Sequence, residues 1–492
     1  MSVARRSAGA DTDEILGRLR ALRARDAPTH GGRVLSYVYD SGRGELDELA
    51  DAAASLARPL NGLDPTVFPS IAVMERDLVG FTRRVLHGGR SVVGSITSGG
   101  TESCLLAVKT ARDLWRRAHP EGGRPRLLTS TNAHAAFQKA ALLFDLDVDA
   151  VPCCENGAVR AADLVERMGD DVAMVVVSAP AYPSGVLDPI EEVAAAADDR
   201  GISCHVDACF GGFVLPWWPG LPRWDFRARG VTSMSADLHK FGYAPKGVSV
   251  LLHRGRRRHR AQFFATTRWA GYPVVNPTLL GSRSASPLAA AWAITQHLGE
   301  RGYAELVGSI QRVAAAVRTA VDGIRGLSVM GEPTGPAMTL VADASAPPEQ
   351  QVDPYHLADA LVGRGWRIQH QPGRLQSDGV RIPHSAHLTF TPVLEQRITE
   401  FTDALRSASD SVRGRPRANA RMLAAGLRAL GYGEGGRVPG PAVSWRLLRL
   451  AGADAVPSGR PMAQLMALIE QLPPPVAEAL LTELLARGSE PR

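Results

Sequence analysis

Short apolar runs rich in β-branched residues alternate with amphipathic stretches through the middle of the chain. The runs predicted to be strands are Ser91–Thr97, Arg126–Ser130, Val148–Pro152, Val172–Ser178, Ile202–Val206, Gly230–Met234 and Gly247–His253. Helical patterning lies between several of them, as in Thr101–Arg117 and Pro189–Arg200. Because the strands are apolar without clean alternation and are separated by helices, the pattern predicts an α/β fold with a mainly parallel sheet covered on both faces.

A second, smaller unit follows two helical stretches, Ala289–Leu298 and Tyr303–Ile324. Its predicted strands and helix are Ser328–Met330, Ala337–Val341, Trp366–His370, His387–Thr391 and the helix Pro354–Arg364. This mixture of short strands with one helix is typical of an α+β domain.

Helical patterns also occupy both ends of the chain. Glu14–Arg25 and Glu45–Leu56 are helical near the start, and Met462–Arg487 reads as an amphipathic helix pair divided by Pro473–Pro475. We therefore predict an N-terminal helical segment (1–60), a large cofactor-binding domain (61–310), a small α+β domain (311–412) and a C-terminal helical extension (413–492).

Composition narrows the class of protein. The chain is 45% hydrophobic with a net charge of +6, a mild excess that does not predict a nucleic-acid partner. Its densest basic cluster, His253–Arg260, is predicted to be a solvated loop after a strand, or else a rim that attracts anions. Arg5 and Arg6 precede no apolar leader, no run approaches the roughly 18 residues that span a bilayer, and five cysteines form no disulfide pattern. We therefore expect a soluble, cytoplasmic protein.

Three motifs carry candidate chemistry, each at the end of a predicted strand. Thr97–Ser103 (Thr-Ser-Gly-Gly-Thr-Glu-Ser) begins a helix, and its glycines, hydroxyls and free N–H groups suit a phosphate, although many turns carry such residues as caps. Asp207 ends an apolar strand, where a carboxylate is costly unless it meets a cation or a metal; the alternative is a helix cap or a buried ion pair. Lys240 follows another strand, where its ammonium form can be disfavoured, although most lysines simply lie at the surface.

Together these three motifs match the needs of pyridoxal 5′-phosphate (PLP). The lysine forms a Schiff base, the acid keeps the pyridine nitrogen protonated, and the cup holds the phosphate. His134 follows a further strand and can stack on the ring. The histidines and cysteines have no zinc-like spacing, so we predict no metal.

The sequence resembles the sphingosine-1-phosphate lyase branch of the group II PLP-dependent decarboxylase superfamily, from about Gly32 to the C-terminus. The matching tracts are Thr97–Ser103, Ala133–Phe137, His205–Phe213, Gly230–Ser233, Ser235–Gly247 and Gly281–Arg283. This resemblance implies the PLP-dependent transferase fold of the aspartate aminotransferases (type I), with a large, mainly parallel seven-stranded sheet domain and a smaller α+β domain.

Carried over position by position, the resemblance also implies residue roles. Lys240 is then the Schiff-base lysine, Asp207 the partner of the pyridine nitrogen and His134 the stacking residue. The residues implied to contact the phosphate are Gly100, Thr101 and His239. Tyr39 and Lys246 match residues tied to substrate binding and turnover. The resemblance implies a homodimer with active sites at the interface, so Ser282 and Arg283 are expected to act across it. The membrane anchor of eukaryotic members has no counterpart here.

Several departures bear on the substrate. The family reads Asn-Pro-Leu-His-Pro where this chain has Asn61-Gly62-Leu63-Asp64-Pro65, so an acid replaces an active-site histidine. A second family histidine is Ser184, and the family tract Gly-Ser-Arg-Pro-Gly-Gly here ends Ser284-Ala285-Ser286. We still expect Asn61 and Asp64 at the substrate site, where a carboxylate opposes a dianionic head group.

The leading interpretation is a retro-aldol carbon–carbon lyase that acts on a phosphorylated sphingoid base or a related β-hydroxy amine. In it a base, Lys240 or Tyr39, takes the β-hydroxyl proton, and an aldehyde and an amine such as phosphoethanolamine are released. The runner-up is amino-acid decarboxylation on the same scaffold. A third interpretation is a PLP-fold protein without turnover that serves as a binding subunit.

Overall fold

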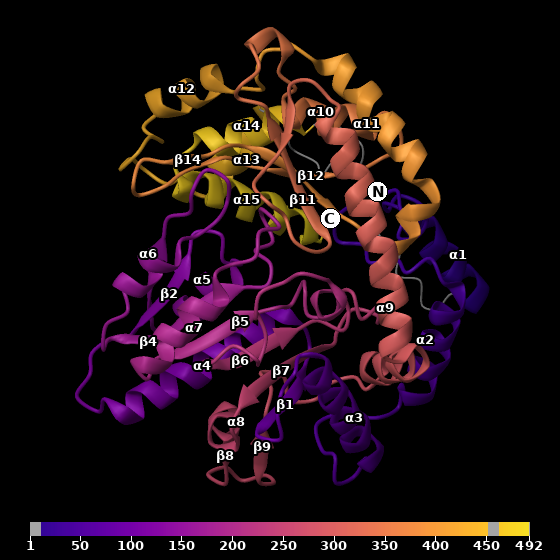
Figure 1. Cartoon of the computed structure of the whole chain (residues 1–492), viewed down its shortest axis with the longest axis vertical. Helices are drawn as coiled ribbons and strands as arrows, with labels where there is room; N and C mark the ends of the chain where they lie inside the picture. Colours follow the sequence, from indigo (N-terminus) through magenta and orange to yellow (C-terminus); the bar gives the residue numbers. More distant parts are fainter. Residues whose placement is uncertain (1–10, 451–461, 492) are drawn as a thin grey trace.

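A seven-stranded sheet forms the centre of the larger domain (Figure 1). The structure is a computed structural model, and it describes residues 11–450 and 462–491. Arg5 and Arg6 lie outside the described residues. The strands are β1 (Val92–Thr97), β2 (Arg126–Ser130), β3 (Asp147–Val151), β4 (Val172–Ser178), β5 (Ser203–Asp207), β6 (Val231–Ala236) and β7 (Ser249–Arg254). Each lies within two residues of its predicted bounds, so the strand predictions are confirmed.

The sheet order is β1-β7-β6-β5-β4-β2-β3. Strand β7 is antiparallel to both of its neighbours, and the other neighbouring pairs are parallel. All seven residues of β4 and all five of β5 are buried, which explains why β4 is apolar on both faces. The predicted α/β fold with a mainly parallel sheet is confirmed.

Helices cover the two faces of the sheet. Met174 and Val176 of β4 pack in one apolar cluster with α4 (Gly100–Ala118) and α5 (Ala136–Phe144), whereas Val175 and Val177 belong to the cluster on the opposite face. The helices that contribute to this second cluster include α3 (Pro69–Val85), α6 (Ala161–Glu166) and α7 (Ile190–Asp199). Side chains of successive residues alternate between the faces, as in any strand.

A long helix, α9 (Ser286–Asp322), runs from the large sheet to the small domain (Figure 1). Its backbone is non-helical at Gly299, which has a φ of 53°, so the two helices predicted from the sequence form one bent rod. The predicted domain boundary at residue 310 falls inside this rod.

The small domain contains a four-stranded antiparallel sheet of order β10-β11-β15-β12. Its elements are β10 (Leu327–Val329), β11 (Ala337–Ala342), α10 (Pro354–Val362), β12 (Gln369–Gln371), β15 (Ser385–Thr389) and α11 (Ile398–Val412), with β13 (Arg374–Leu375) and β14 (Arg381–Ile382) forming a separate hairpin. Among the described residues, 3₁₀ segments of one turn lie at Leu215–Trp217, in the large domain, and at Pro348–Gln350, and a longer 3₁₀ segment lies at Pro392–Arg397.

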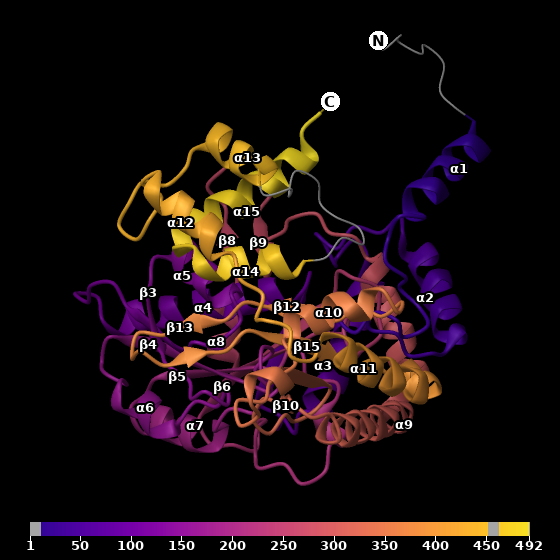
Figure 2. The ribbon, with the colours of Figure 1, turned by 90° about the horizontal axis from the view of Figure 1, so that it is seen from above.

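Helices extend the fold at both ends. All residues of α1 (Thr12–Arg23) are exposed and the helix projects from the body (Figure 2), whereas α2 (Gly44–Ala57) buries Leu46, Ala50 and Ala57. The C-terminal helices α12 (Arg421–Ala429), α13 (Pro441–Leu450), α14 (Ala463–Gln471) and α15 (Pro474–Ser489) share an apolar cluster of their own. The break predicted at Pro473–Pro475 separates α14 from α15.

The basic cluster was predicted to be a loop, and that prediction is wrong. His253 and Arg254 end β7, and Arg256–Gln262 forms helix α8. The His253 ring is buried and its Nε2 lies 2.9 Å from Gln262 Oε1, while Arg254 Nε donates to the Val231 carbonyl at 2.7 Å. A hairpin of β8 (Phe264–Thr266) and β9 (Val274–Asn276) follows. Across residues 11–450 and 462–491, no helix is both long and apolar enough to cross a bilayer.

Candidate active site

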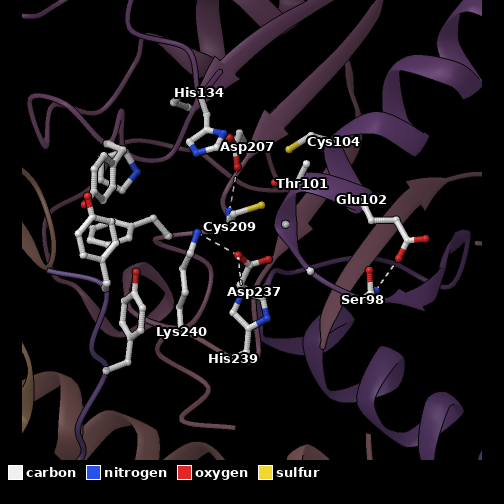
Figure 3. Close-up of a pocket in the computed structure, with 18 of the residues that line it drawn as sticks. Ser98, Thr101, Glu102, Cys104, His134, Asp207, Cys209, Asp237, His239 and Lys240 are labelled. Atoms are coloured by element: carbon white, nitrogen blue, oxygen red, sulfur yellow. Dashed lines mark hydrogen bonds and ion pairs between the residues drawn. The ribbon is translucent and has the colours of Figure 1, made fainter. Parts of the chain in front are cut away.

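A cavity of about 510 Å³ opens at the carboxyl ends of the central strands, where loops and helix starts converge (Figure 3). This is the edge at which parallel α/β sheets bind ligands. The lining includes residues of all three sequence motifs, namely Gly100, Thr101, Asp207, His239 and Lys240, together with Tyr39 and His134. The folded chain therefore brings together seven predicted site residues that are up to 201 positions apart in the sequence.

The phosphate cup is the N-terminus of α4. This helix begins at Gly100, and no side chain of the described residues caps it. A Cβ on Gly100 would lie 2.6 Å from an Asp237 carboxylate oxygen and 2.8 Å from Cys209 Sγ, so only glycine fits there. The Ser98 N–H donates to Glu102 Oε2 at 2.6 Å, which fixes the turn. The uncapped N–H groups and the positive end of the helix dipole suit an anion.

Asp207 ends β5 and points into the cavity beside His134 (Figure 3). Its Oδ1 accepts a hydrogen bond from the Cys209 N–H at 3.0 Å and one from Ser235 Oγ at 3.3 Å, which hold the carboxylate in place. His134 Nδ1 accepts a hydrogen bond from the Ala136 N–H at 3.1 Å, so the ring is held at the start of α5.

Lys240 and Asp237 form a buried ion pair, with 2.9 Å between Lys240 Nζ and Asp237 Oδ2. Burial alone would lower the pKa of Lys240, but the nearby negative charges, chiefly that of Asp237, raise it well above its usual range. From the sequence, we predicted that the ammonium form of Lys240 would be disfavoured at this position. That prediction is wrong, because the ion pair with Asp237 favours the ammonium form. Burial likewise opposes the charge on Asp237, but Lys240 and then His239 hold its pKa below the usual range.

Aromatic side chains, among them Tyr39 and Tyr182, line the side of the cavity that faces the small domain. The Tyr39 ring packs edge-on against Phe241 at 5.1 Å, and burial raises the pKa of Tyr39 to about 12. The Tyr182 hydroxyl donates to Gln369 Oε1 at 2.7 Å, so a residue of β12 contributes to the cavity. Lys246 lies just outside the lining, with its Nζ 4.4 Å from the centre of the Tyr39 ring. Sequence reasoning missed Asp237, Tyr182 and Gln369.

The remaining predicted residues lie apart from this cavity within one chain. Ser282 and Arg283 line a neighbouring cavity of about 260 Å³ that shares Ser98 with the first. Asn61 Nδ2 donates to Ser282 Oγ at 3.1 Å, and Arg283 pairs with Glu75. Asp64 is exposed and binds the Thr66 hydroxyl at 2.6 Å.

Ser184, which stands where the family has a histidine, is buried away from the cavity lining. Its Oγ is 3.4 Å from the Gly157 carbonyl, and a Cβ on Gly157 would collide with the Ser184 side chain. A histidine would not fit there without displacing the Gly157 loop, so this substitution is matched by its surroundings.

The residues that line the cavity fit PLP. An uncapped helix start, an aspartate held by two hydrogen bonds and a lysine amine line one cavity. These would meet the phosphate, the pyridine nitrogen and the aldehyde carbon, respectively.

Comparisons with known proteins give the family of this chain. Residues 56–341 match the pyridoxal-dependent decarboxylase conserved domain, and residues 421–487 match the C-terminal helix-turn-helix (HTH) domain described for pyridoxal-dependent enzymes. The chain is 34% identical to a sphingosine-1-phosphate lyase of Oryza sativa subsp. japonica over 87% of this chain and 77% of that protein. It is also 34% identical to sphingosine-1-phosphate lyase 1 of Rattus norvegicus, over 85% and 71%.

A solved structure leads to the same group of proteins. The sphingosine-1-phosphate lyase of Burkholderia pseudomallei K96243 superposes with a TM-score of 0.76 at 34% identity, covering 87% of this chain and 96% of that one. A glutamate decarboxylase of Lactobacillus brevis superposes with a TM-score of 0.72 at 20% identity, which shows a shared fold.

Proposed function

We propose, from the premise that this chain belongs to the sphingosine-1-phosphate lyase-like branch of the pyridoxal-dependent decarboxylase family, that it cleaves the Cα–Cβ bond of a phosphorylated sphingoid base. The products are a long-chain aldehyde and phosphoethanolamine. The observation that carries this proposal is that Lys240, Asp207 and the α4 N-terminus line one cavity.

PLP is the cofactor of this family, and when bound it supplies the electron sink for the bond that breaks. The residues that would hold it are Lys240 at its aldehyde carbon, Asp207 at its pyridine nitrogen and His134 on its ring face. Gly100, Thr101 and His239 would surround its phosphate.

Two side chains are placed to handle the proton of the β-hydroxyl group. Lys240 can take this proton only after its amine has lost its own, and Asp237, 2.9 Å from Nζ, would then stabilise the ammonium that forms. Tyr39 keeps its own proton at neutral pH, because burial raises its pKa to about 12. We therefore assign Tyr39 to hydrogen-bond donation toward the substrate and Lys240 to proton removal.

The substrate phosphate needs positive charge, and Lys246 supplies it at the mouth of the cavity. The negative charge of Asp64 repels a dianionic head group. We therefore place the substrate phosphate near Lys246 and away from Asp64. We further propose a homodimer in which Asn61, Ser282 and Arg283 complete the partner's site, and a cytoplasmic location.

Release of aldehyde from dihydrosphingosine phosphate tests the activity. The chain has four lysines, Lys109, Lys139, Lys240 and Lys246, so borohydride reduction followed by peptide mapping identifies the Schiff-base lysine without ambiguity. Lys240→Ala should abolish both aldehyde release and the reduced adduct. The exposed Lys139, changed to Arg, is the matched control and should retain both.

Two results would contradict the proposal. An adduct on a lysine other than Lys240 would reject the site. Carbon dioxide release from amino acids, without aldehyde release from any phosphorylated or free β-hydroxy amine, would replace the lyase with the amino-acid decarboxylase.

A further inference from the structure

Two cysteines from separate motifs meet at the floor of the cavity. Cys104 lies on the first turns of α4, and Cys209 follows β5. Their sulfur atoms and a carboxylate oxygen of Asp207 all lie within 4.8 Å of one another (Figure 3). The spacing of 105 residues between the cysteines gave no sign of this cluster, and the prediction of no metal rested on spacing alone.

The surroundings of the two thiols are buried and negatively charged. Cys104 is 1% exposed and Cys209 is 7% exposed, and both line the cavity. Cys209 Sγ also lies 3.1 Å from Ser235 Oγ. Of the nearby carboxylates, Asp207 belongs to the cluster and Asp237 pairs with Lys240 at 2.9 Å. Binding of a cation by the two thiols requires both of them to release their protons.

We propose that Cys104, Cys209 and Asp207 form a binding site for a thiophilic divalent cation, of which Zn²⁺ is the physiological example. Two thiolates and one carboxylate, with water as the fourth ligand, match the three-ligand open zinc sites of proteins. On binding, two metal–sulfur bonds form, two S–H bonds break and two protons leave to solvent. The resulting charge of −1 is balanced by the Lys240 ammonium nearby.

The same carboxylate would serve the cofactor, so the cation and PLP exclude one another. This second step rests on the proposed function, in which Asp207 meets the pyridine nitrogen. Zinc would then hold the protein in a state that cannot load PLP, and the cofactor would displace the metal.

Cadmium titration of the PLP-free protein tests the site, because Cd²⁺–thiolate bonds absorb in the ultraviolet. We expect one Cd²⁺ per chain, loss of the band in Cys104→Ser and its retention in Cys154→Ala, which removes an exposed thiol. X-ray absorption of the zinc form should show two sulfur ligands at about 2.3 Å. With free Zn²⁺ at about ten times its dissociation constant, the PLP concentration for half-saturation should rise about tenfold, and only in protein with Cys104.

The outcomes separate the two steps. No thiolate band in the PLP-free protein, or an equal band in Cys104→Ser with unchanged circular dichroism, overturns the site. A bound metal that leaves PLP half-saturation unchanged overturns the exclusion. If the chain takes up no PLP at all, the proposed function fails, and the cadmium and X-ray absorption measurements still decide the metal site.

Discussion

The charge of Lys246 gives a prediction about pH. Burial, and after it the nearby Lys240 ammonium, lower the pKa of Lys246 to about 8. Lys246 Nζ donates to the His239 carbonyl at 2.8 Å and lies over the Tyr39 ring. The Lys246 amine therefore carries its positive charge below about pH 8 and is mostly neutral above it. The positive charge offered to the substrate phosphate is therefore lost as the pH rises through about 8.

The size of the effect follows from the midpoint. About half of Lys246 is charged at pH 8 and about a tenth at pH 9, so kcat/KM for a phosphorylated substrate should fall roughly tenfold per pH unit above the midpoint. Part of the residue is exposed, and solvent screening moves the midpoint upward rather than downward. Lys246→Arg should keep its charge throughout, because a guanidinium has a pKa above about 12.

Initial rates of aldehyde release from dihydrosphingosine phosphate, measured between about pH 6 and pH 10, provide the assay. Lys139→Arg serves as the control and should reproduce the wild-type profile. The reasoning is refuted if the fall in kcat/KM above pH 8 persists unchanged in Lys246→Arg, since another group would then be titrating.

Three further changes have defined outcomes. In Asp237→Asn the Lys240 ammonium loses the partner that raises its pKa, so the rate of PLP uptake, followed by visible absorbance, should peak at lower pH than in the wild type; an unmoved profile would contradict this role. Tyr39→Phe should lower kcat while PLP uptake stays normal, because Tyr39 is assigned to the substrate; a loss of PLP uptake would reassign it to the cofactor. Glu470→Gln weakens contacts with Arg381 and Arg417 and, because both guanidinium groups are about half exposed, should cost about 0.5–1 kcal/mol of unfolding free energy, measured by urea denaturation with Arg406→Gln as a surface control.

The sequence predicted the large sheet well because its strands carry strong local signals. Most strands of the series from Val92 to Arg254 are short apolar runs, and helices separate the first five of them, which is the pattern of a buried, mainly parallel sheet. The candidate site was predictable for the same reason, since Asp207 and Lys240 each follow such a strand and the carboxyl ends of strands meet at one edge.

Contacts between distant segments were not predictable from local pattern. The pairing of Asn61 with Ser282, and the meeting of Cys104 with Cys209, depend on how helices and loops pack on the sheet. Asp237 is part of the Lys240 motif, but the sequence did not show that the two side chains form an ion pair, with 2.9 Å between Lys240 Nζ and Asp237 Oδ2. The match of residues 421–487 to an HTH domain also lay beyond the sequence reasoning, and the absence of a nucleic-acid partner stays a prediction.

The bend at Gly299 divides α9 into two parts, and the second part extends to Asp322. About 23 residues separate the bend from the end of the helix, a length of about 35 Å at the rise of an α-helix, so a rotation of about 5° there moves the far end by about 3 Å. That displacement exceeds the 2.7 Å hydrogen bond by which Gln369 of the small domain reaches Tyr182. A rotation at Gly299 would therefore move the small domain by as much as the length of the hydrogen bond that joins Gln369 to Tyr182.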